Sequence, residues 1–485
     1  MITYGISANE HDASVAVVRD REILFASAAE RYSRVKNDAQ LNAGLLADAM
    51  RCGAPDLVVW YEKPHLKRAR KAWAGQFSEV GRVDGAGYVR RYLPGVPVRY
   101  VGHHESHAAG GFFTSPFDDA VILVVDAIGE WETISAWRGR GHTLRRLWKQ
   151  NYPDSLGLLY SAFTQRVGFK PNEEEYILMG MAATGEPVYR DLIWQDFIES
   201  FEPPRLVLRE NPHRGIRWWR PEIDRLQDIA ASIQAVTEEI LLGIVRWLAR
   251  VTDARNLVLS GGVALNCVAN TAIAREGLFD AIWIMPNPGD GGSSLGAALA
   301  WSRLPARWRH PYLGHTIDRL FDRDGALADL LAGRVVGVAT GRAEFGPRAL
   351  GNRSLFADPR DPTTKDKVNA IKRREPFRPF APIVLAEHVH EHFDLPVPGS
   401  PYMQFVAKVR CPEAFPAIVH TDGTARVQTL RREDNPVIYG LLEAFHRQTG
   451  CPMLLNTSLN VKGEPLVNSV ADAQRFTATA GIPVY

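Results

Sequence analysis

Residues 226–252 read LQDIAASIQAVTEEILLGIVRWLARVT, and residues 256–266 read NLVLSGGVALN. The first stretch carries apolar residues at intervals of three and four, which predicts a long amphipathic helix. The second is a short apolar run that stops at two glycines, which predicts a buried strand followed by a turn. A helix that leads directly into a buried strand is typical of α/β proteins. The sequence therefore predicts an α/β fold.

Other predicted strands also end in polar turns. Residues 5–34 predict strands around a polar turn at 8–12 that contains His11, and AVILVVDAIGE predicts a strand from Ala120 that ends on Asp126. In NPGDGGSSLGAALA, Asp290 lies in a glycine-rich turn before a predicted helix. The N–H groups at the start of such a helix favour an anion.

The glycine pair Gly261-Gly262 lacks side chains, so a ligand such as a nucleotide can approach the backbone there. A single glycine pair is weak evidence. Together with the strands that end in aspartate and with GDGGSS, it matches the layout of the actin-like ATPase fold, in which two similar halves enclose a nucleotide.

His103 and His107 are four residues apart, which on a helix places both imidazoles on one face. Such a pair is either a polar helix face or a metal site, and Asp126 and Asp290 favour the metal site. A mixed His/Asp set of four suits a first-row metal with open positions better than structural zinc. A metallopeptidase is excluded, because His104 stands where H-E-x-x-H requires glutamate.

Length and composition indicate a folded protein of two or three domains. The chain has 485 residues, of which 46% are hydrophobic and 23% charged, so disordered and fibrous classes are excluded. Its 57 Lys and Arg against 55 Asp and Glu predict no particular partner. The four separated cysteines predict reduced, mostly buried thiols. No signal peptide and no apolar run of about 18 residues are evident, so we expect a cytoplasmic protein without membrane contact.

Residues 304–315, LPARWRHPYLGH, lack a clear period and predict a linker between domains at 1–310 and 316–485. The second domain concentrates cations among Gly and Pro turns, beside aromatic residues. These cations form either a solvated surface or a partly buried anion pocket, which arginine and aromatic walls favour. The set comprises Arg342, Arg348, Arg353, Lys372, Arg373, Arg374 and Arg378, with Phe345, Phe377 and Phe380. Farther on, Arg426, Asn456, Ser458 and Asn460 offer polar groups for phosphate or ribose.

Six strings carry a closer resemblance. The chain resembles the carbamoyltransferase family, which includes nodulation-factor and antibiotic O-carbamoyltransferases, in six strings that occur in the same order: HHESHAAGGFF, LSGGVALNCVAN, NPGDGGSSLGAALA, EFGPRALGNRS, IKRREPFRPFAP and LLNTSLNVKGEP. The match extends over nearly the whole chain. The resemblance implies an actin-like N-terminal domain, similar to the tRNA threonylcarbamoyl transferase, and a C-terminal domain similar to threonylcarbamoyl-adenylate synthase.

The resemblance also implies a two-step reaction. The C-terminal domain would join carbamoyl phosphate and ATP, with Mg(II), into carbamoyl-adenylate. The N-terminal domain, with a metal that is usually Fe(II) in this family, would pass the carbamoyl group to an acceptor hydroxyl. A homodimer is common in the family. The alternatives are a non-catalytic actin-like nucleotide-binding protein and a tRNA-modifying transferase of the same type.

The family pattern assigns roles position by position. It implies metal ligation by His103, His107, Asp126 and Asp290, and carbamoyl phosphate binding by Arg348, Lys372 and Arg378. It implies nucleotide contacts by Arg426, Asn456, Ser458, Gly261, Gly262 and Asn266. His11 and Lys36 match groups near the transferred carbamoyl, where His11 either accepts the hydroxyl proton or only forms a hydrogen bond.

Residues 62–100 leave the acceptor open. This segment interleaves nine basic residues with three aromatic ones: Lys63, Lys67, Arg68, Arg70, Lys71, Arg82, Arg90, Arg91 and Arg99, with Trp73, Tyr88 and Tyr92. A second basic-aromatic stretch covers residues 213–220 (HRGIRWWR). These are either a solvated helix face or a phosphate-contacting rim with platforms for bases. The rim would indicate a nucleotide or DNA acceptor, for example hydroxymethylcytosine. The family default is a sugar or polyketide hydroxyl of a natural product.

Overall fold

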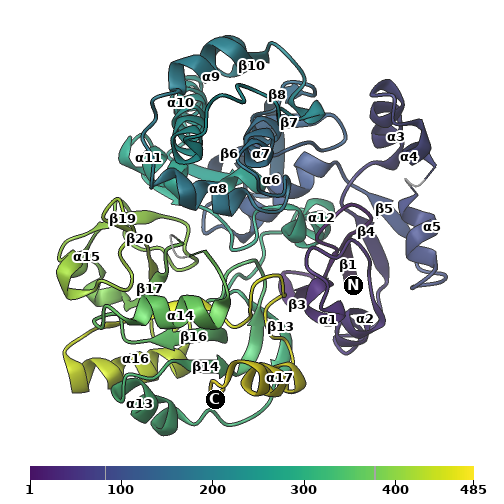
Figure 1. Cartoon of the computed structure of the whole chain (residues 1–485). Helices are drawn as coiled ribbons and strands as arrows, with labels where there is room; N and C mark the ends of the chain where they lie inside the picture. The colour runs from purple at the N-terminus through teal and green to yellow at the C-terminus, as the bar shows by residue number, and fades with distance from the viewer. Residues whose placement is uncertain (82–83, 376–377) are drawn as a thin grey trace. The chain divides into compact units, whose positions relative to one another are not determined.

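A computed structural model describes residues 1–81, 84–375 and 378–485 (Figure 1). The chain forms two compact units. The first comprises Met1–Ala29 and Asn37–Trp308, and the second comprises Glu30–Lys36 and Arg309–Tyr485. Both units combine strands with helices, which confirms the predicted α/β class.

The first unit contains two five-stranded sheets with the same topology. One sheet has the order β3-β2-β1-β4-β5, and the other has the order β8-β7-β6-β11-β12. In each, three antiparallel strands are followed by two strands that pair in parallel. This repeat confirms the two similar halves expected of an actin-like fold. The strands are β1 (Ile2–Ser7), β2 (Ser14–Arg19), β3 (Glu22–Ala28), β4 (Leu57–Trp60), β5 (Val98–Tyr100), β6 (Asp119–Val125), β7 (Glu132–Arg140), β8 (Thr143–Asn151), β11 (Asn256–Ser260) and β12 (Ala281–Trp283).

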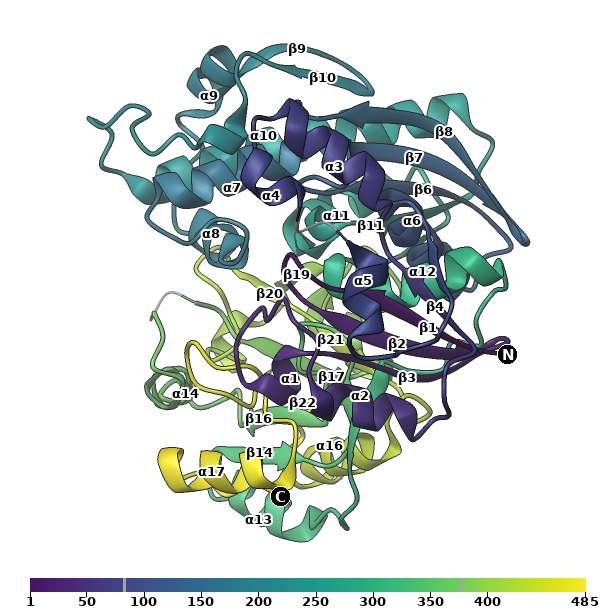
Figure 2. The ribbon, with the colours of Figure 1, turned by 90° about the vertical axis from the view of Figure 1, so that its right-hand side faces the viewer.

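Two helices lie between these sheets, as Figure 2 shows. Helix α12 (Ser293–Ser302) packs on β1, β2 and β4, and helix α6 (His103–Thr114) packs on β6, β7 and β11. The two helices also pack on each other where Gly296 meets Ser106: a Cβ on Gly296 would lie 2.0 Å from the Ser106 carbonyl oxygen. Only glycine permits this approach. It brings the start of α12 close to the first turn of α6.

The predicted long helix is α10 (Leu226–Val251), which leads into β11 as expected. Its apolar stripe is buried, whereas most of its charged residues are not. The other elements of the first unit are α2 (Ala43–Met50), α3 (Pro64–Trp73), α4 (Phe77–Val80), α5 (Gly85–Arg90), α7 (Leu156–Arg166), α8 (Glu175–Ala182), α9 (Arg190–Phe197), α11 (Cys267–Arg275) and the hairpin β9 (Ile198–Glu202)–β10 (Arg205–Leu208).

The second unit is built on a sheet of order β14-β16-β22-β17-β21, beside a three-stranded sheet and a two-stranded ribbon, β13-β15. Its strands are β13 (Tyr312–Ile317), β14 (Val336–Ala339), β15 (Gly341–Glu344), β16 (Arg353–Ala357), β17 (Ala381–Leu385), β18 (Phe393–Asp394), β19 (Val406–Val409), β20 (Thr424–Arg426), β21 (Gln428–Leu430) and β22 (Met453–Ser458). Its helices are α1 (Glu30–Ser33), α13 (Arg323–Leu331), α14 (Thr364–Lys372), α15 (Val389–His392), α16 (Pro436–Thr449) and α17 (Val470–Ala480).

The predicted linker is only partly correct. Residues 303–310 form no helix or strand, but Tyr312 begins β13, which pairs with β15. Tyr312 and Leu313 are buried, so their apolar side chains stabilise a strand where the sequence lacks a visible period. The unit boundary lies between Trp308 and Arg309, and residues 30–36 join the second unit. The assignment of the two units to the named domain types stays a prediction.

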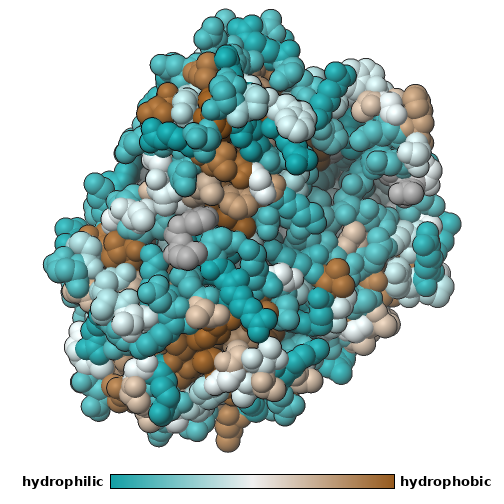
Figure 3. All heavy atoms as spheres, in the orientation of Figure 1, coloured by the Kyte–Doolittle hydropathy of each residue, from teal (hydrophilic) through white to brown (hydrophobic). Residues whose placement is uncertain are grey.

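Two further features of the fold are the distribution of hydrophobic residues on its surface and the state of its cysteines. Figure 3 shows small hydrophobic patches separated by hydrophilic residues on the face drawn. No disulfide joins the four cysteines, all of which lie within the described residues: Cys267 and Cys451 are buried, Cys52 is half-buried and Cys411 is exposed. Among the described residues, no helix is long and apolar enough to cross a membrane.

Candidate active site

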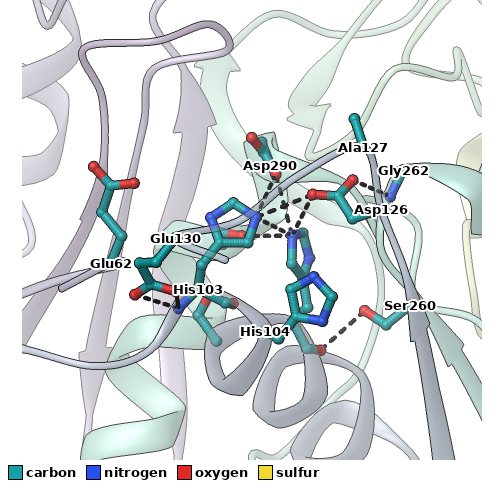
Figure 4. Close-up of polar contacts among 12 residues, drawn as sticks. Glu62, His103, His104, Asp126, Ala127, Glu130, Ser260, Gly262 and Asp290 are labelled. Carbon is teal, nitrogen blue, oxygen red and sulfur yellow. Dashed lines mark hydrogen bonds and ion pairs between the residues drawn. The ribbon is translucent and has the colours of Figure 1, made fainter. Parts of the chain in front are cut away.

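The predicted metal ligands converge at the meeting point of three elements of the first unit (Figure 4). His103 and His107 lie in the first two turns of α6, as their spacing predicts. Asp126 directly follows β6, and Asp290 opens the short helical turn before α12. The close packing of α6 and α12 places Asp290 against the histidine pair. One ligand atom from each of the four side chains lies within 4.8 Å of the others.

The distances within this cluster are those of groups that face a common centre. His103 Nε2 lies 3.1 Å from Asp126 Oδ2 and 3.3 Å from Asp290 Oδ1. His107 Nε2 lies 3.1 Å from Asp290 Oδ1 and 3.1 Å from His103 Nε2. All four residues are buried or nearly so.

The chemistry of these donors fits a divalent metal. Nδ1 of His107 faces the Pro288 carbonyl oxygen at 3.0 Å, so this nitrogen carries the proton and donates it. This orientation leaves His107 Nε2 facing His103 and Asp290, where a neutral imidazole would present a lone pair to a cation. A cation at the centre would satisfy two imidazole nitrogens and two carboxylate oxygens, and further positions would stay open to a substrate.

The charges of these buried side chains shift the pKa values of His103, Asp126 and Asp290. Although burial and Asp290 oppose its ionisation, His103 and His107 lower the pKa of Asp126 to about 2. The same histidines hold the pKa of Asp290 well below its usual value despite burial. Burial disfavours charge on His103, but Asp290 and Asp126 raise its pKa well above the ordinary value. Two ionised carboxylates in a buried site require a positive partner.

Surrounding groups fix these ligands. The backbone N–H of Gly262 donates to Asp126 Oδ1 at 3.0 Å. Glu130, which is buried, accepts hydrogen bonds from the backbone N–H groups of His103, at 3.1 Å, and Lys63, at 2.7 Å. It thereby caps the N-terminus of α6. Sequence reasoning missed Glu130 and the Pro288 carbonyl. Glu130 lies only four residues after Asp126, whereas a backbone carbonyl leaves no signal in a sequence.

The predicted nucleotide turn is tightly built. Gly261 has φ +87°, and a Cβ there would lie 2.2 Å from the Val125 carbonyl oxygen, so only glycine fits. Asn266 caps α11, because its Oδ1 accepts from the Ala269 N–H at 3.1 Å. Its side-chain amide also exchanges hydrogen bonds with Gln234. Asn266 therefore shapes this turn, and its contact with a nucleotide stays a prediction.

His11 lies at the exposed side of the metal cluster. Its Nδ1 is 3.0 Å from Asp12 Oδ2 and its Nε2 is 3.7 Å from Asp290 Oδ2, while 44% of its side chain is exposed. Burial disfavours its charged form, but Asp12, Asp290 and Asp126 raise the pKa of His11 to about 10. Lys36 belongs to the second unit, so its predicted action with His11 stays a prediction.

In the second unit the structure brings Lys372 and Ser458 together. The Lys372 ammonium is buried and donates to the hydroxyl of Ser458 at 2.8 Å and to Asn460 Oδ1 at 2.6 Å. Burial, with Arg374 and Arg378 nearby, lowers the pKa of Lys372 well below its usual value. This concentration of cations suits a multiply charged anion.

The other predicted residues of this unit lie in several elements. Arg348 is half-buried in the loop 346–352, and Arg378 lies 3.6 Å from Glu375. Arg426 ends β20, and Asn456 is buried in β22. Their ligand contacts stay predictions. Phe377, predicted as a pocket wall, lies outside the described residues.

Arg353 does not belong to an anion pocket, contrary to its prediction. It begins β16, is fully buried, and donates to the carbonyl oxygens of residues 315, 340, 341, 352 and 468. Its Nη1 and Nη2 groups are therefore occupied by backbone carbonyls of the fold. In the sequence Arg353 is indistinguishable from Arg348, because both lie among glycines and small residues.

The basic segment of residues 62–100 is internal only in part. Lys67, Arg70 and Lys71 are buried, whereas Arg68, Arg90, Arg91 and Arg99 are exposed, and Arg82 lies outside the described residues. Lys67 Nζ lies 2.7 Å from Glu62 and 2.9 Å from Glu10, and Lys71 Nζ lies 2.7 Å from Glu79. Both lysines are buried. These carboxylates neutralise Lys67 and Lys71, two of the cations that the rim interpretation included.

The aromatic residues of the two basic stretches are also mostly structural. Tyr88 is buried, and its hydroxyl accepts from the Leu41 N–H at 2.8 Å. In the second stretch, Trp219 donates to Asp196 Oδ2 at 2.9 Å, whereas Trp218 is 79% exposed. Trp73 is 63% exposed, but its ring packs on Trp131. These contacts favour structural packing over a row of platforms for bases.

Two family models and several curated relatives indicate one family. The family model "Carbamoyltransferase N-terminus" matches residues 83–299, and "Carbamoyltransferase C-terminus" matches residues 327–485. The nodulation protein NolNO of Sinorhizobium fredii is 34% identical over 96% of this chain and 76% of its own. The 3'-hydroxymethylcephem-O-carbamoyltransferase of Amycolatopsis lactamdurans is 31% identical over 97% of this chain and 95% of its own. The solved structure of full-length HypF covers 62% of this chain and 46% of its own, with 14% identity and a TM-score of 0.36.

Proposed function

The chain belongs to the carbamoyltransferase family and is a transferase, and we propose that it forms carbamoyl-adenylate from carbamoyl phosphate and ATP and then transfers the carbamoyl group to an acceptor hydroxyl. The observation that carries this proposal is the convergence of His103, His107, Asp126 and Asp290 on one buried centre. These four residues would hold the metal, for which we propose Fe(II). A bound ion of this kind supplies Lewis acidity to the carbamoyl carbonyl or the adenylate phosphate.

The cation cluster of the second unit supports the adenylate-forming step. Loss of phosphate from carbamoyl phosphate by hydrolysis leaves carbamate, whose oxygen would attack the α-phosphorus of ATP and displace pyrophosphate. During this attack, negative charge develops on the oxygens of the α-phosphate in the transition state. We assign its stabilisation to Arg348, Lys372 and Arg378, because a small dianion needs several cations to offset its desolvation.

His11 would act on the transferred group in the first unit. Its 44% exposed side chain and its 3.7 Å distance to Asp290 support this role, because an acceptor could approach the His/Asp cluster from this side. The family pattern implies that His11 either accepts the proton of the acceptor hydroxyl or forms a hydrogen bond with the carbamoyl group.

We further propose that the acceptor is a small molecule with a free hydroxyl. The name of the Amycolatopsis relative, 3'-hydroxymethylcephem-O-carbamoyltransferase, refers to a hydroxymethyl group on a cephem, which is a small molecule. In this chain, Lys67 and Lys71 are buried against carboxylates, which argues against a surface for phosphate backbones.

The direct test incubates the protein with ATP, carbamoyl phosphate, Mg²⁺ and candidate acceptors. We expect pyrophosphate to form only when ATP and carbamoyl phosphate are both present, and the acceptor to gain the mass of one carbamoyl group. Omission of carbamoyl phosphate is the control. Absence of pyrophosphate from the complete mixture would contradict the assignment of the adenylate-forming reaction.

Salt should have little effect on acceptor use. Proteins that contact six to ten phosphates lose about 10³- to 10⁵-fold in affinity between 50 and 200 mM salt. With ATP and carbamoyl phosphate saturating and the acceptor below its KM, we expect the transfer rate to change by less than about threefold over this range. A steep fall in the rate would instead indicate a nucleic-acid acceptor and would refute the small-molecule assignment.

A further inference from the structure

The loop 346–352 of the second unit, GPRALGN, has Arg348 as its single basic residue. Its backbone is held by side chains from several other elements. At one end, Arg31 donates to the Gly346 carbonyl oxygen at 2.8 Å. Toward the other end, the Gly351 N–H donates to the Ser354 hydroxyl at 3.0 Å. Arg348 therefore lies between two fixed points.

Glu344 holds the second half of this loop. Its Oε1 accepts three backbone hydrogen bonds, from Leu350 at 2.8 Å, Asn352 at 2.9 Å and Arg353 at 3.2 Å. The side chain is only 2% exposed. Hydrogen bonds to an ionised carboxylate are stronger than those between neutral groups. One carboxylate oxygen thus fixes the backbone at three positions that follow Arg348.

A chain of amides sets the orientation of Asn456. The Leu350 carbonyl can only accept, so the group of Gln428 that lies 3.0 Å from it must be Nε2. Gln428 Oε1 then faces Asn456 at 2.7 Å, which requires Nδ2 of Asn456 on that side. The same Nδ2 donates to the Ala349 carbonyl at 3.1 Å. Both amide hydrogens of Asn456 are therefore used to hold the loop.

We propose that Glu344 and Asn456 are positioning residues for carbamoyl phosphate: they fix the backbone beside Arg348 so that its guanidinium is already placed for the dianion. Bidentate contact with a small anion tolerates little displacement, and a shift of about 1 Å can cost about 10²-fold. The proposal rests on the proposed function, since it takes Arg348 as an anion ligand. Under this proposal Asn456 supports the anion site and does not make the nucleotide contact that the family resemblance implies.

The test is a double-mutant cycle. Asn456→Asp replaces both amide donors with an acceptor-only group of the same shape, and Glu344→Gln removes the charge. We expect each variant to raise the KM for carbamoyl phosphate by about 30-fold and the KM for ATP by less than about twofold. In an Arg348→Lys background the same changes should raise the carbamoyl phosphate KM by less than about threefold, because a flexible lysine depends less on the loop.

Asn256→Asp is the matched control, because the Asn256 amide donates to the Asp119 carbonyl in the first unit and the KM values should not change. A rise in the KM for ATP would restore Asn456 to the nucleotide site and overturn the proposal. An effect that persists undiminished in the Arg348→Lys background would show a merely structural role. If Asn456→Asp does not fold, Glu344→Gln decides by the same criteria.

Calorimetric titration with carbamoyl phosphate alone separates this proposal from the proposed function. Weaker binding in the two variants supports the positioning role even if the wild type makes no pyrophosphate. Equal binding by wild type and variants refutes the positioning role even if pyrophosphate is made.

Discussion

Asp290→Asn is expected to lower carbamoyl transfer about 10³-fold while pyrophosphate forms from ATP and carbamoyl phosphate at the wild-type rate. Asp290 Oδ1 lies within 3.3 Å of both histidine Nε2 atoms, and its carboxylate supplies negative charge that an amide cannot. Metal ligation and carbonyl activation are worth several kcal/mol, and about 4 kcal/mol corresponds to that factor. The measurements are carbamoylated acceptor by mass spectrometry, pyrophosphate release, and metal content by elemental analysis.

Asp280→Asn is the matched control for this change, because Asp280 forms an exposed ion pair with Arg255 in the same unit. The control should keep both activities and the bound metal. Loss of pyrophosphate formation in Asp290→Asn would mean that the metal cluster serves both steps. Unchanged transfer and unchanged metal content would remove Asp290 from the site.

Lys372→Met should produce the opposite separation. We expect carbamoyl phosphate-dependent pyrophosphate formation to fall at least about 10³-fold, while transfer from carbamoyl-adenylate supplied in the assay continues. Methionine keeps most of the length of the unbranched side chain but removes the buried nitrogen that contacts Ser458 and Asn460. Lys367→Met is the control, because Lys367 lies on the same helix in an exposed pair with Asp361.

Calorimetry adds a second readout for Lys372. Burial lowers the pKa of this lysine in the free protein, and a bound dianion favours the charged ammonium. In a series of titrations at increasing pH, carbamoyl phosphate binding should take up protons from the buffer once the pH exceeds the lowered pKa of Lys372 in the wild type, and Lys372→Met should show no such uptake. Proton uptake that is equal in both proteins would assign the titration to another group, and undiminished pyrophosphate formation would exclude Lys372 from the anion site.

The convergence of the His/Asp cluster could be predicted in part because some of its signals are local. The spacing of His103 and His107 follows from the pitch of a helix, and Asp126 follows a recognisable strand. The approach of Asp290 depends on the packing of Gly296 against Ser106, which no local pattern contains. The family resemblance supplied that connection.

The failures share one physical cause, namely that charge in a sequence does not reveal its partner in space. Lys67 is neutralised by Glu62 nearby but also by Glu10, which is 57 positions away. Arg353 is paired with carbonyl groups, which every residue has. The strand at Tyr312 was missed for a related reason, because β15, with which it pairs, lies far along the chain.

The short segment 30–36 makes the second unit discontinuous in sequence, because it is separated from the rest of that unit by most of the first unit. Arg31 supports the carbonyl of Gly346, and Arg34 donates to the carbonyls of Leu466 and Pro465, yet both arginines are encoded between stretches of the first unit. A single cut at residue 308 would keep every strand of the second unit but discard these two guanidinium groups. The two units can therefore not be exchanged between relatives as separate modules, because a recombination point that preserves one of them necessarily divides the other.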